Sequence, residues 1–205
     1  MSRGRFIVLE GGEGAGKSTN ARFIQSWLQS RNRKTLITRE PGGAPLAEAI
    51  RDLVLGWSGE MPARTELLLM FAARSVHLAT TIEPALSAGT DVICDRFVDS
   101  TYAYQGAGRG ITSAEIESLE KTVVRDCQPD LVIVFDLDPE RGLARVKARG
   151  EQNRFETERL EFQRRVRSVF LERARRAPQR YAVIDAARSL VEVQAELVQM
   201  LEQRL

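Results

Sequence analysis

The chain has 205 residues, 43% of them hydrophobic and 28% charged, which suffices for one well-packed domain but not for two. We therefore expect a single domain over residues 1–205. The formal net charge of +2 gives no overall basic surplus, so neither nucleic acid nor a membrane surface is indicated as a partner. The apolar stretch near the amino terminus is too short for a signal peptide, and the aliphatic run at residues 131–135 cannot span a bilayer. These features predict a cytoplasmic protein.

Short β-rich apolar runs alternate with longer helical patterns along the chain. The runs lie at residues 5–9, 34–38, 91–94, 130–137 and 181–184. Two helix starts carry capping boxes, at Thr112 with Glu115 and at Ser189 with Glu192. The alternation predicts an α/β fold in which a parallel five-stranded sheet is flanked by helices on both faces.

The first strand is followed by a glycine-rich loop and then by the amphipathic run 21–28. The loop and its next residue read Gly11, Gly12, Glu13, Gly14, Ala15, Gly16, Lys17, Ser18 and Thr19. This G-x-x-x-x-G-K-S pattern between a strand and a helix predicts a P-loop that binds the phosphates of ATP through its backbone N–H groups. We expect Lys17 to reach the β- and γ-phosphates and the Ser18 hydroxyl to ligate Mg²⁺. A chance match is the alternative, and the strand and helix on either side argue against it.

A long helical pattern surrounds residues 67–78. Phe71 and Arg74 are three residues apart and therefore share a helix face. An aromatic ring there can stack on a base and an arginine fork can donate to base-edge acceptors, whereas core packing is the alternative for Phe71. The single histidine, His77, lies in the same pattern, which leaves little material for histidine-dependent catalysis or metal binding. The apolar residues of this pattern serve either the core or a subunit contact.

Two further segments carry charge that suits phosphate chemistry. The third strand ends at Asp95, which we expect in the Mg²⁺ shell, and Arg96 follows as a clamp for a phosphate or for the transferring phosphoryl group. A strand-end ion pair is the alternative. The stretch with Arg149, Gly150 and Arg154 fits either a lid, at approximately residues 149–158, or a basic surface loop.

The segment from Asp95 onward is specific enough to resemble a known family. It reads Asp95-Arg96-Phe97 and then Ser100-Thr101-Tyr102-Ala103-Tyr104-Gln105-Gly106, which resembles the thymidylate kinases. The blocks Thr38–Gly43 and Leu68–Arg74 are similar to that family as well, so the resemblance extends from Phe6 to about Arg154. It implies a P-loop fold like that of nucleoside monophosphate kinases, and Mg²⁺-dependent transfer of the γ-phosphoryl group from ATP to dTMP, giving dTDP and ADP. It also implies a homodimer.

The resemblance assigns residues to the nucleoside of the acceptor. It implies that Phe71 stacks on thymine and that Arg74 donates to thymine O4. By the same resemblance, Thr101 and Gln105 contact the base edge, and Tyr104 packs against the deoxyribose. Further substrate contacts are implied for Glu13 near the sugar, and for Arg39, Pro41, Arg51, Arg96 and Ser100, among which Arg51 is a stronger phosphate candidate than Arg39.

The resemblance also bears on catalysis and on ATP. Members place a catalytic arginine either in the phosphate loop or in the lid, and this loop has none. The chain therefore resembles the bacterial arrangement, with Arg149 and Arg154 as the lid arginines. Adenine contacts are implied near Arg141 or Arg145 and at residues 185–187. One departure is Ala44, where the family usually has threonine, and it puts a hydroxyl contact in doubt.

Two other functions compete with this interpretation. A kinase for another nucleoside monophosphate is possible because an arginine also pairs with guanine O6. A nucleotide-gated switch of the GTPase type is the rival outside catalysis, but the sequence contains no guanine-reading Asn-Lys-x-Asp motif. Turnover against a panel of monophosphates separates the three.

Overall fold

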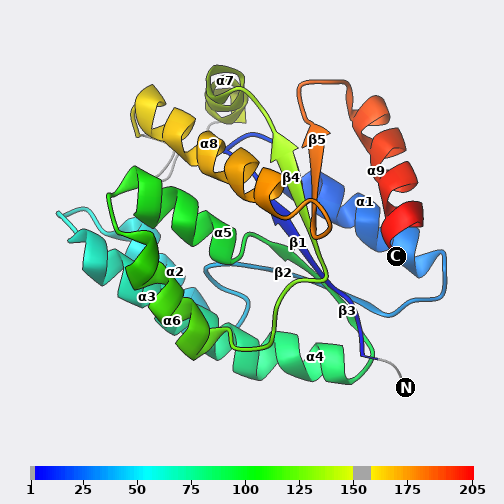
Figure 1. Cartoon of the computed structure of the whole chain (residues 1–205), viewed down its shortest axis with the longest axis horizontal. Helices are drawn as coiled ribbons and strands as arrows, with labels where there is room; N and C mark the ends of the chain where they lie inside the picture. Colours follow the sequence, from blue (N-terminus) through cyan, green and yellow to red (C-terminus); the bar gives the residue numbers. More distant parts are fainter. Residues whose placement is uncertain (1–2, 150–157) are drawn as a thin grey trace.

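In the computed structural model, which describes residues 3–149 and 158–205, a parallel sheet forms the centre of the fold (Figure 1). The strand order is β2-β3-β1-β4-β5. The strands are β1 (Phe6–Glu10), β2 (Thr35–Arg39), β3 (Asp91–Asp95), β4 (Leu131–Asp136) and β5 (Tyr181–Asp185). The central strands β3, β1 and β4 are buried because helices cover both sheet faces, which explains their continuous apolar sequences. The predicted five-stranded parallel α/β sheet is confirmed, with each strand boundary within one residue.

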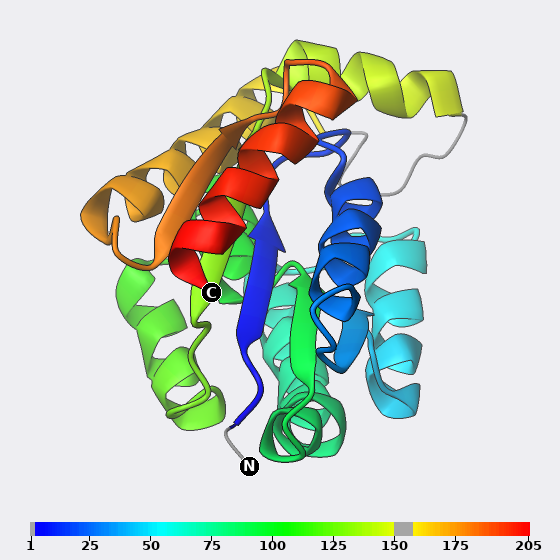
Figure 2. The same ribbon diagram turned by 90° about the vertical axis from the view of Figure 1, so that its right-hand side faces the viewer.

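Helices lie on both faces of this sheet. They are α1 (Lys17–Gln29), α2 (Pro45–Gly56), α3 (Ala63–His77), α4 (Glu83–Ser87), α5 (Val98–Thr101), α6 (Ser113–Val123), α7 (Pro139–Arg149), α8 (Leu160–Arg176) and α9 (Leu190–Arg204), with π-helices η1 (Leu78–Ile82) and η2 (Tyr102–Gly108). Figure 2 shows α1 and α9 on one side of the sheet, where Ile24 and Leu197 share a core with Ile7 of β1. Helices α3, α6 and α8 contribute to a second core on the opposite face.

The helix starts follow the sequence closely, whereas the π-helices do not. Both capping boxes are present, since Thr112 and Ser189 each accept from the backbone N–H three residues later. The two π-helical segments continue α3 and α5 directly, and no local sequence pattern predicted them. Such wider turns are frequent at functional sites. Among the described residues, none of the helices combines the length and the apolar character that a bilayer crossing requires.

The carboxyl ends of the parallel strands meet at one edge, which positions the site. The phosphate loop follows β1, the Glu40–Gly43 segment follows β2, and Arg96 follows β3. Helix α7 touches the phosphate loop through glycines: a Cβ on Gly14 would lie 2.3 Å from the Gly142 oxygen, and a Cβ on Gly142 would lie 2.3 Å from the Glu13 oxygen. The missing side chains allow α7 to lie directly against the loop.

Candidate phosphotransfer site

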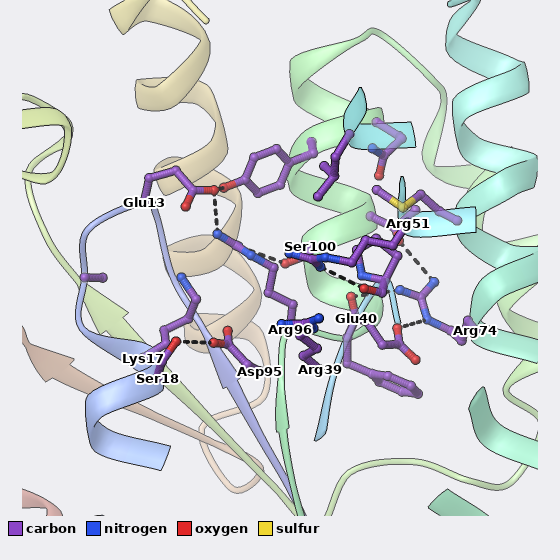
Figure 3. Close-up of a pocket in the computed structure, with 18 of the residues that line it drawn as sticks. Glu13, Lys17, Ser18, Arg39, Glu40, Arg51, Arg74, Asp95, Arg96 and Ser100 are labelled. Carbon is purple, nitrogen blue, oxygen red and sulfur yellow. Dashed lines mark hydrogen bonds and ion pairs between the residues drawn. The ribbon is translucent and has the colours of Figure 1, made fainter. Parts of the chain in front are cut away.

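A cavity of about 380 Å³ opens at the carboxyl edge of the sheet (Figure 3). Residues from five separate segments of the chain line it, because the loops after β1, β2 and β3 converge there with α2 and α3. The predicted site residues on its surface are Glu13, Gly14, Ala15, Gly16, Lys17, Ser18, Thr19, Arg39, Pro41, Arg51, Arg74, Asp95, Arg96, Ser100, Thr101, Tyr104 and Gln105. The sequence therefore identified most of the cavity's polar surface.

The phosphate loop presents its lysine at the start of a helix. Gly16, in the left-handed conformation with φ 84°, precedes α1, which begins at Lys17. Lys17 Nζ donates to the Gly11 oxygen at 3.1 Å and to the Gly12 oxygen at 2.9 Å. Burial, and then the positive charge of Arg96, lower the pKa of Lys17 from its ordinary value. A phosphate at this helix terminus would offer the lysine an anionic partner in place of two neutral carbonyls.

Ser18 and Asp95 provide hard oxygen donors beside the loop. Ser18 Oγ donates to Asp95 Oδ2 at 3.0 Å (Figure 3). Asp95 Oδ1 is buried and has no hydrogen-bond partner among residues 3–149 and 158–205. Hydroxyl and carboxylate oxygens are the donors that Mg²⁺ prefers, with water completing its shell. The donor set therefore fits a magnesium ion.

Arg96 has a strained backbone and a side chain held from several directions. Its φ of 72° lies in the left-handed region, which is uncommon for a residue with a Cβ. Its guanidinium donates to Glu13 Oε1 at 2.7 Å, to the Gly11 oxygen at 3.0 Å and to Ser100 Oγ at 3.2 Å. Tyr104 donates its hydroxyl to the same Glu13 oxygen at 2.9 Å. Burial alone would lower the pKa of Arg96, but the facing charge of Glu13 raises it, so the cation persists.

Glu10 supports this arrangement and was not predicted. Its Oε1 accepts from the backbone N–H of Phe97 at 2.8 Å and of Ser100 at 3.1 Å, and its Oε2 accepts from Ser100 Oγ at 2.7 Å. The side chain is fully buried, and burial, followed by the charge of Asp99, raises the pKa of Glu10 to about 7. A carboxylate at a strand end, immediately before the phosphate loop, is the sequence signal that would have found it.

Arg74 lies at the far end of the cavity from the phosphate loop and is 3% exposed. Its Nε donates to Glu40 Oε2 at 2.7 Å, its Nη1 to Thr101 Oγ1 at 3.1 Å and its Nη2 to the Phe97 oxygen at 3.0 Å. The guanidinium carbon lies 4.9 Å from the Phe71 ring centroid and 5.2 Å from that of Phe97. Two aromatic rings and three acceptors therefore fix this arginine inside the wall of the cavity.

Phe71 occupies a different place from the one predicted for it. Its ring is 2% exposed, belongs to the core under the sheet and does not line the cavity. The preceding residue, Met70, is only partly buried and does line the cavity. Phe71 faces the core, whereas Arg74 on the next turn reaches the wall of the cavity, so a spacing of three residues identified neighbours without identifying which of them faces the open side. Met70, rather than Phe71, therefore faces the cavity from this part of α3.

The remaining cavity residues differ in how firmly they are held. Gln105 Nε2 donates to Glu66 Oε1 at 2.8 Å, and both side chains are buried. Arg51 Nη1 donates to the Pro41 oxygen at 2.8 Å, and burial followed by the charge of Arg39 lowers the pKa of Arg51.

Arg39 itself is exposed and pairs with Glu48 at 3.0 Å. Glu48 also accepts from the Gly43 backbone at 2.8 Å, at the start of α2, where Ala44 is the N-cap and supplies no side-chain bond. The Glu48 carboxylate thus binds the backbone immediately before this cap, and the cap residue itself contributes no side-chain hydrogen bond.

The arginines predicted near the adenine do not line the cavity. Arg141 donates to the Ala187 oxygen at 3.0 Å, and Arg145 donates to the Ala186 oxygen at 3.2 Å and to the Gly14 oxygen at 3.3 Å. The structure thus brings the predicted adenine residues together beside the phosphate loop. Arg154 and most of the predicted lid lie outside the described residues, and Arg149 is described only as the last residue of α7.

Comparison with known proteins identifies the family. The model of the thymidylate kinase family matches residues 9–197. A thymidylate kinase of Pseudomonas fluorescens is 56% identical over 98% of this chain and 97% of its own length, and one of Chromohalobacter salexigens is 52% identical over 100% and 98%. The crystal structure of a thymidylate kinase from Ehrlichia chaffeensis superposes with a TM-score of 0.80 at 33% identity, covering 98% of this chain and 99% of that one. The chain belongs to the thymidylate kinase family.

Proposed function

We infer that the chain transfers the γ-phosphoryl group of ATP to dTMP, giving dTDP and ADP. Membership of the family, at more than half identity over nearly the full length, establishes this activity. The observation that carries our assignment of roles is the convergence of Lys17, Arg96 and Arg74 on one cavity. A phosphate-binding end and a base-binding end of the same cavity suit a nucleoside monophosphate facing ATP.

At the phosphate-binding end, we propose that the loop from Gly11 to Thr19 binds the phosphates of ATP and that Lys17 compensates their charge. Ser18 and Asp95 would hold Mg²⁺, partly through water, as the free oxygen of Asp95 allows. A bound magnesium ion would supply positive charge that offsets the negative charge of the phosphates. No side chain forms a covalent intermediate in this proposal, so positioning and charge stabilisation supply the catalysis.

For the acceptor phosphate, we propose Arg96 as the principal clamp, supported by Arg51 and Ser100. Glu13 pairs with Arg96, and Tyr104 donates to the same carboxylate oxygen. A phosphate provides a stronger anionic partner for Arg96, which would release Glu13 toward the neighbouring sugar. Exposed Arg39 is the weaker candidate because its charge already pairs with Glu48 at the surface.

At the base-binding end, Arg74 retains one N–H on each terminal nitrogen beyond the hydrogen bonds described above. We propose that these donate to thymine O4, which disfavours cytosine because its 4-amino group is itself a donor. Met70 would pack against the base through its polarisable thioether. Thr101 and Gln105 line the same end, and Tyr104 would lie against the deoxyribose.

Three further roles remain proposals. Arg149 and Arg154 would bring positive charge to the transferring phosphoryl group, because the phosphate loop contains no arginine. Arg141, Arg145 and residues 185–187 would contact the adenine. We also propose a cytoplasmic location, where nucleotides for DNA synthesis are made.

We propose that the protein is a homodimer, supported by an apolar stripe on α2 and α3. Leu46 is 59%, Leu53 44% and Leu68 57% exposed, and Trp57, just after α2, is 49% exposed. Residues 46, 53 and 57 follow helical spacing on one face, and α2 contacts α3. The residues around Leu67–Leu78 that the sequence offered for this purpose are mostly core. Analytical sedimentation of Leu53→Glu beside the wild type tests the stripe, because a charge there should weaken the dimer. A Leu53→Glu protein that dimerises as well as the wild type would contradict this role of the stripe.

The activity is tested by ATP–Mg²⁺ turnover with dTMP, dUMP, dCMP and dGMP in parallel. We expect dTMP to give the highest kcat/KM and dCMP to be strongly disfavoured. A higher kcat/KM for another monophosphate would show that this other nucleotide is the acceptor substrate. Tight GTP binding without any turnover would replace it with the switch alternative.

A further inference from the structure

Four buried polar residues form a chain of hydrogen bonds that reaches Arg74 from behind the cavity. Glu40 Oε2 accepts from Arg74 Nε at 2.7 Å, and Glu40 Oε1 lies 3.0 Å from His77 Nδ1. His77 Nε2 lies 2.6 Å from Thr38 Oγ1. None of the four is more than 8% exposed, and His77 is completely buried. The chain thus joins the loop after β2 to α3 with almost no contact with solvent.

Chemistry assigns the protons in this chain. An ionised Glu40 carboxylate only accepts hydrogen bonds, so His77 Nδ1 carries the proton that it shares with Glu40. With the ring neutral, its other nitrogen accepts from the Thr38 hydroxyl. In this assignment His77 is neutral, each oxygen of Glu40 has a donor, and the charge of Glu40 is balanced by Arg74. His77 therefore completes the environment of a buried carboxylate.

We propose that His77 and Glu40 are positioning residues that hold the guanidinium plane of Arg74 in the orientation that recognises the nucleobase. This inference rests on the proposed role of Arg74. Glu40 engages Nε alone, which leaves the outer nitrogens to Thr101, the Phe97 oxygen and the base. Without His77, the second oxygen of Glu40 lacks a donor and competes for another N–H of Arg74. The fork would then turn away from the base.

The close contact of the loop with the ring supports a fixed geometry. A Cβ on Gly43 would lie 2.3 Å from His77 Nε2 and 2.4 Å from Thr38 Oγ1, and Gly43 has φ 80°. The backbone of Gly43 thus lies so close to the ring and to the Thr38 hydroxyl that a side chain at this position would collide with both. The contact consequently fixes the position of the loop that carries Glu40 relative to the helix that carries Arg74.

The test uses steady-state kinetics of the full chain with His77→Leu and His77→Asn. Leucine removes both ring nitrogens, whereas the asparagine amide places an N–H donor near Nδ1. For His77→Leu we expect KM for dTMP to rise about tenfold and KM for ATP to change less than about twofold. The preference for dTMP over dCMP should fall by about tenfold as well. His77→Asn should restore most of both quantities. A purely structural role predicts lower thermal stability with unchanged KM for dTMP, and that result overturns the inference.

Arg74→Lys separates this inference from the proposed function. If Arg74→Lys leaves KM for dTMP unchanged, the proposed role of Arg74 fails, and this inference fails with it. If Arg74→Lys raises KM while His77→Leu does not, only this inference fails. When both act, we expect Arg74→Lys combined with His77→Leu to show no increase beyond Arg74→Lys alone.

A second variant covers the case in which His77→Leu does not fold by circular dichroism. Thr38→Val keeps the side-chain shape and removes only the hydroxyl that donates to the ring. We expect a rise of about threefold in KM for dTMP with an unchanged KM for ATP. An unchanged KM for dTMP in a folded Thr38→Val protein overturns the inference.

Discussion

The two ends of the cavity are built in different ways. At the phosphate-binding end, the loop between Gly11 and Lys17 offers backbone N–H groups and a helix terminus, so most of the binding chemistry belongs to the main chain. At the base-binding end, Arg74 is fixed by Glu40 and Thr101 from two other segments of the chain and by Phe71 from its own helix. The first design is local in sequence, and the second depends on tertiary packing. Single substitutions should therefore change different kinetic parameters: kcat at the phosphate-binding end and KM for dTMP at the base-binding end.

The largest effect is expected from Lys17→Ala. The substitution removes the one positively charged side chain of the loop, so kcat should fall on the order of a thousandfold. The fold should persist, because Lys17 bonds only to two loop carbonyls within the described residues. Steady-state kinetics together with circular dichroism measure both quantities. Turnover close to that of the wild type would contradict the catalytic role assigned to the loop.

Phe71→Ala and Met70→Ala sharpen the comparison at the other end. Phe71→Ala should lower the free energy of unfolding by about 3 kcal/mol because it opens a cavity in the core. Met70→Ala should cost much less stability, because the side chain is only partly buried, but should raise KM for dTMP about tenfold. Urea unfolding and kinetics on both variants decide the matter. A selective rise in KM for dTMP with Phe71→Ala alone would instead show that the Phe71 ring contacts the base.

Glu10→Gln tests the buried Glu10 carboxylate, which accepts hydrogen bonds from the backbone of Phe97 and Ser100. Its raised pKa means that the folded chain binds this proton more tightly than the unfolded chain does, so its contribution to stability is complete below about pH 4.5 and is lost as pH rises through about 7. The difference corresponds to about 3 kcal/mol. Relative to the wild type, Glu10→Gln should gain about that amount between about pH 5 and pH 8.

Urea unfolding of the wild type and Glu10→Gln at both pH values measures this difference. The amide keeps an acceptor for the Phe97 and Ser100 backbone, so it matches the protonated acid in shape. A stability difference between the two proteins that is independent of pH would show that Glu10 is ionised throughout.

The smallest effect concerns a helix cap. Ala44 gives α2 no side-chain cap, so Ala44→Ser should stabilise the fold by about 0.5–1 kcal/mol without changing kcat. Ser189→Ala is the matched control, since it removes an existing capping box and should cost about 1 kcal/mol. Thermal unfolding of both variants provides the comparison. A loss of stability in Ala44→Ser would mean that this nearly buried position has no space for a hydroxyl.

The sequence predicted features that depend on local pattern. The parallel sheet, the phosphate loop and the two capping boxes each follow from consecutive residues and were found within one residue. The direction in which Phe71 faces was not predictable, because periodicity defines a helix face but does not say whether core or cavity covers it. The π-helix η2, which packs against α8, was also not predicted.

The roles of Glu40 and His77 also escaped the sequence. Glu40 was assigned only to a family block, and His77 was considered for catalysis or metal binding. The available signal was the spacing of Arg74 and His77, three residues apart on one helix, facing a carboxylate distant in sequence. Such long-range pairs become visible only when the strand ends are brought together.

The contact between Gly43 and the imidazole ring bears on how this family diverges. Since no Cβ fits at position 43 while His77 stays in place, the two positions cannot drift independently. A Cβ at position 43 would also lie 2.4 Å from Thr38 Oγ1, so a library randomised at positions 38, 43 and 77 should recover active clones as joint genotypes, with any residue larger than glycine at 43 accompanied by smaller ones at both 38 and 77. Covariation at these sites would then record a change in how Arg74 is supported, while the residues that touch the nucleotide stay the same.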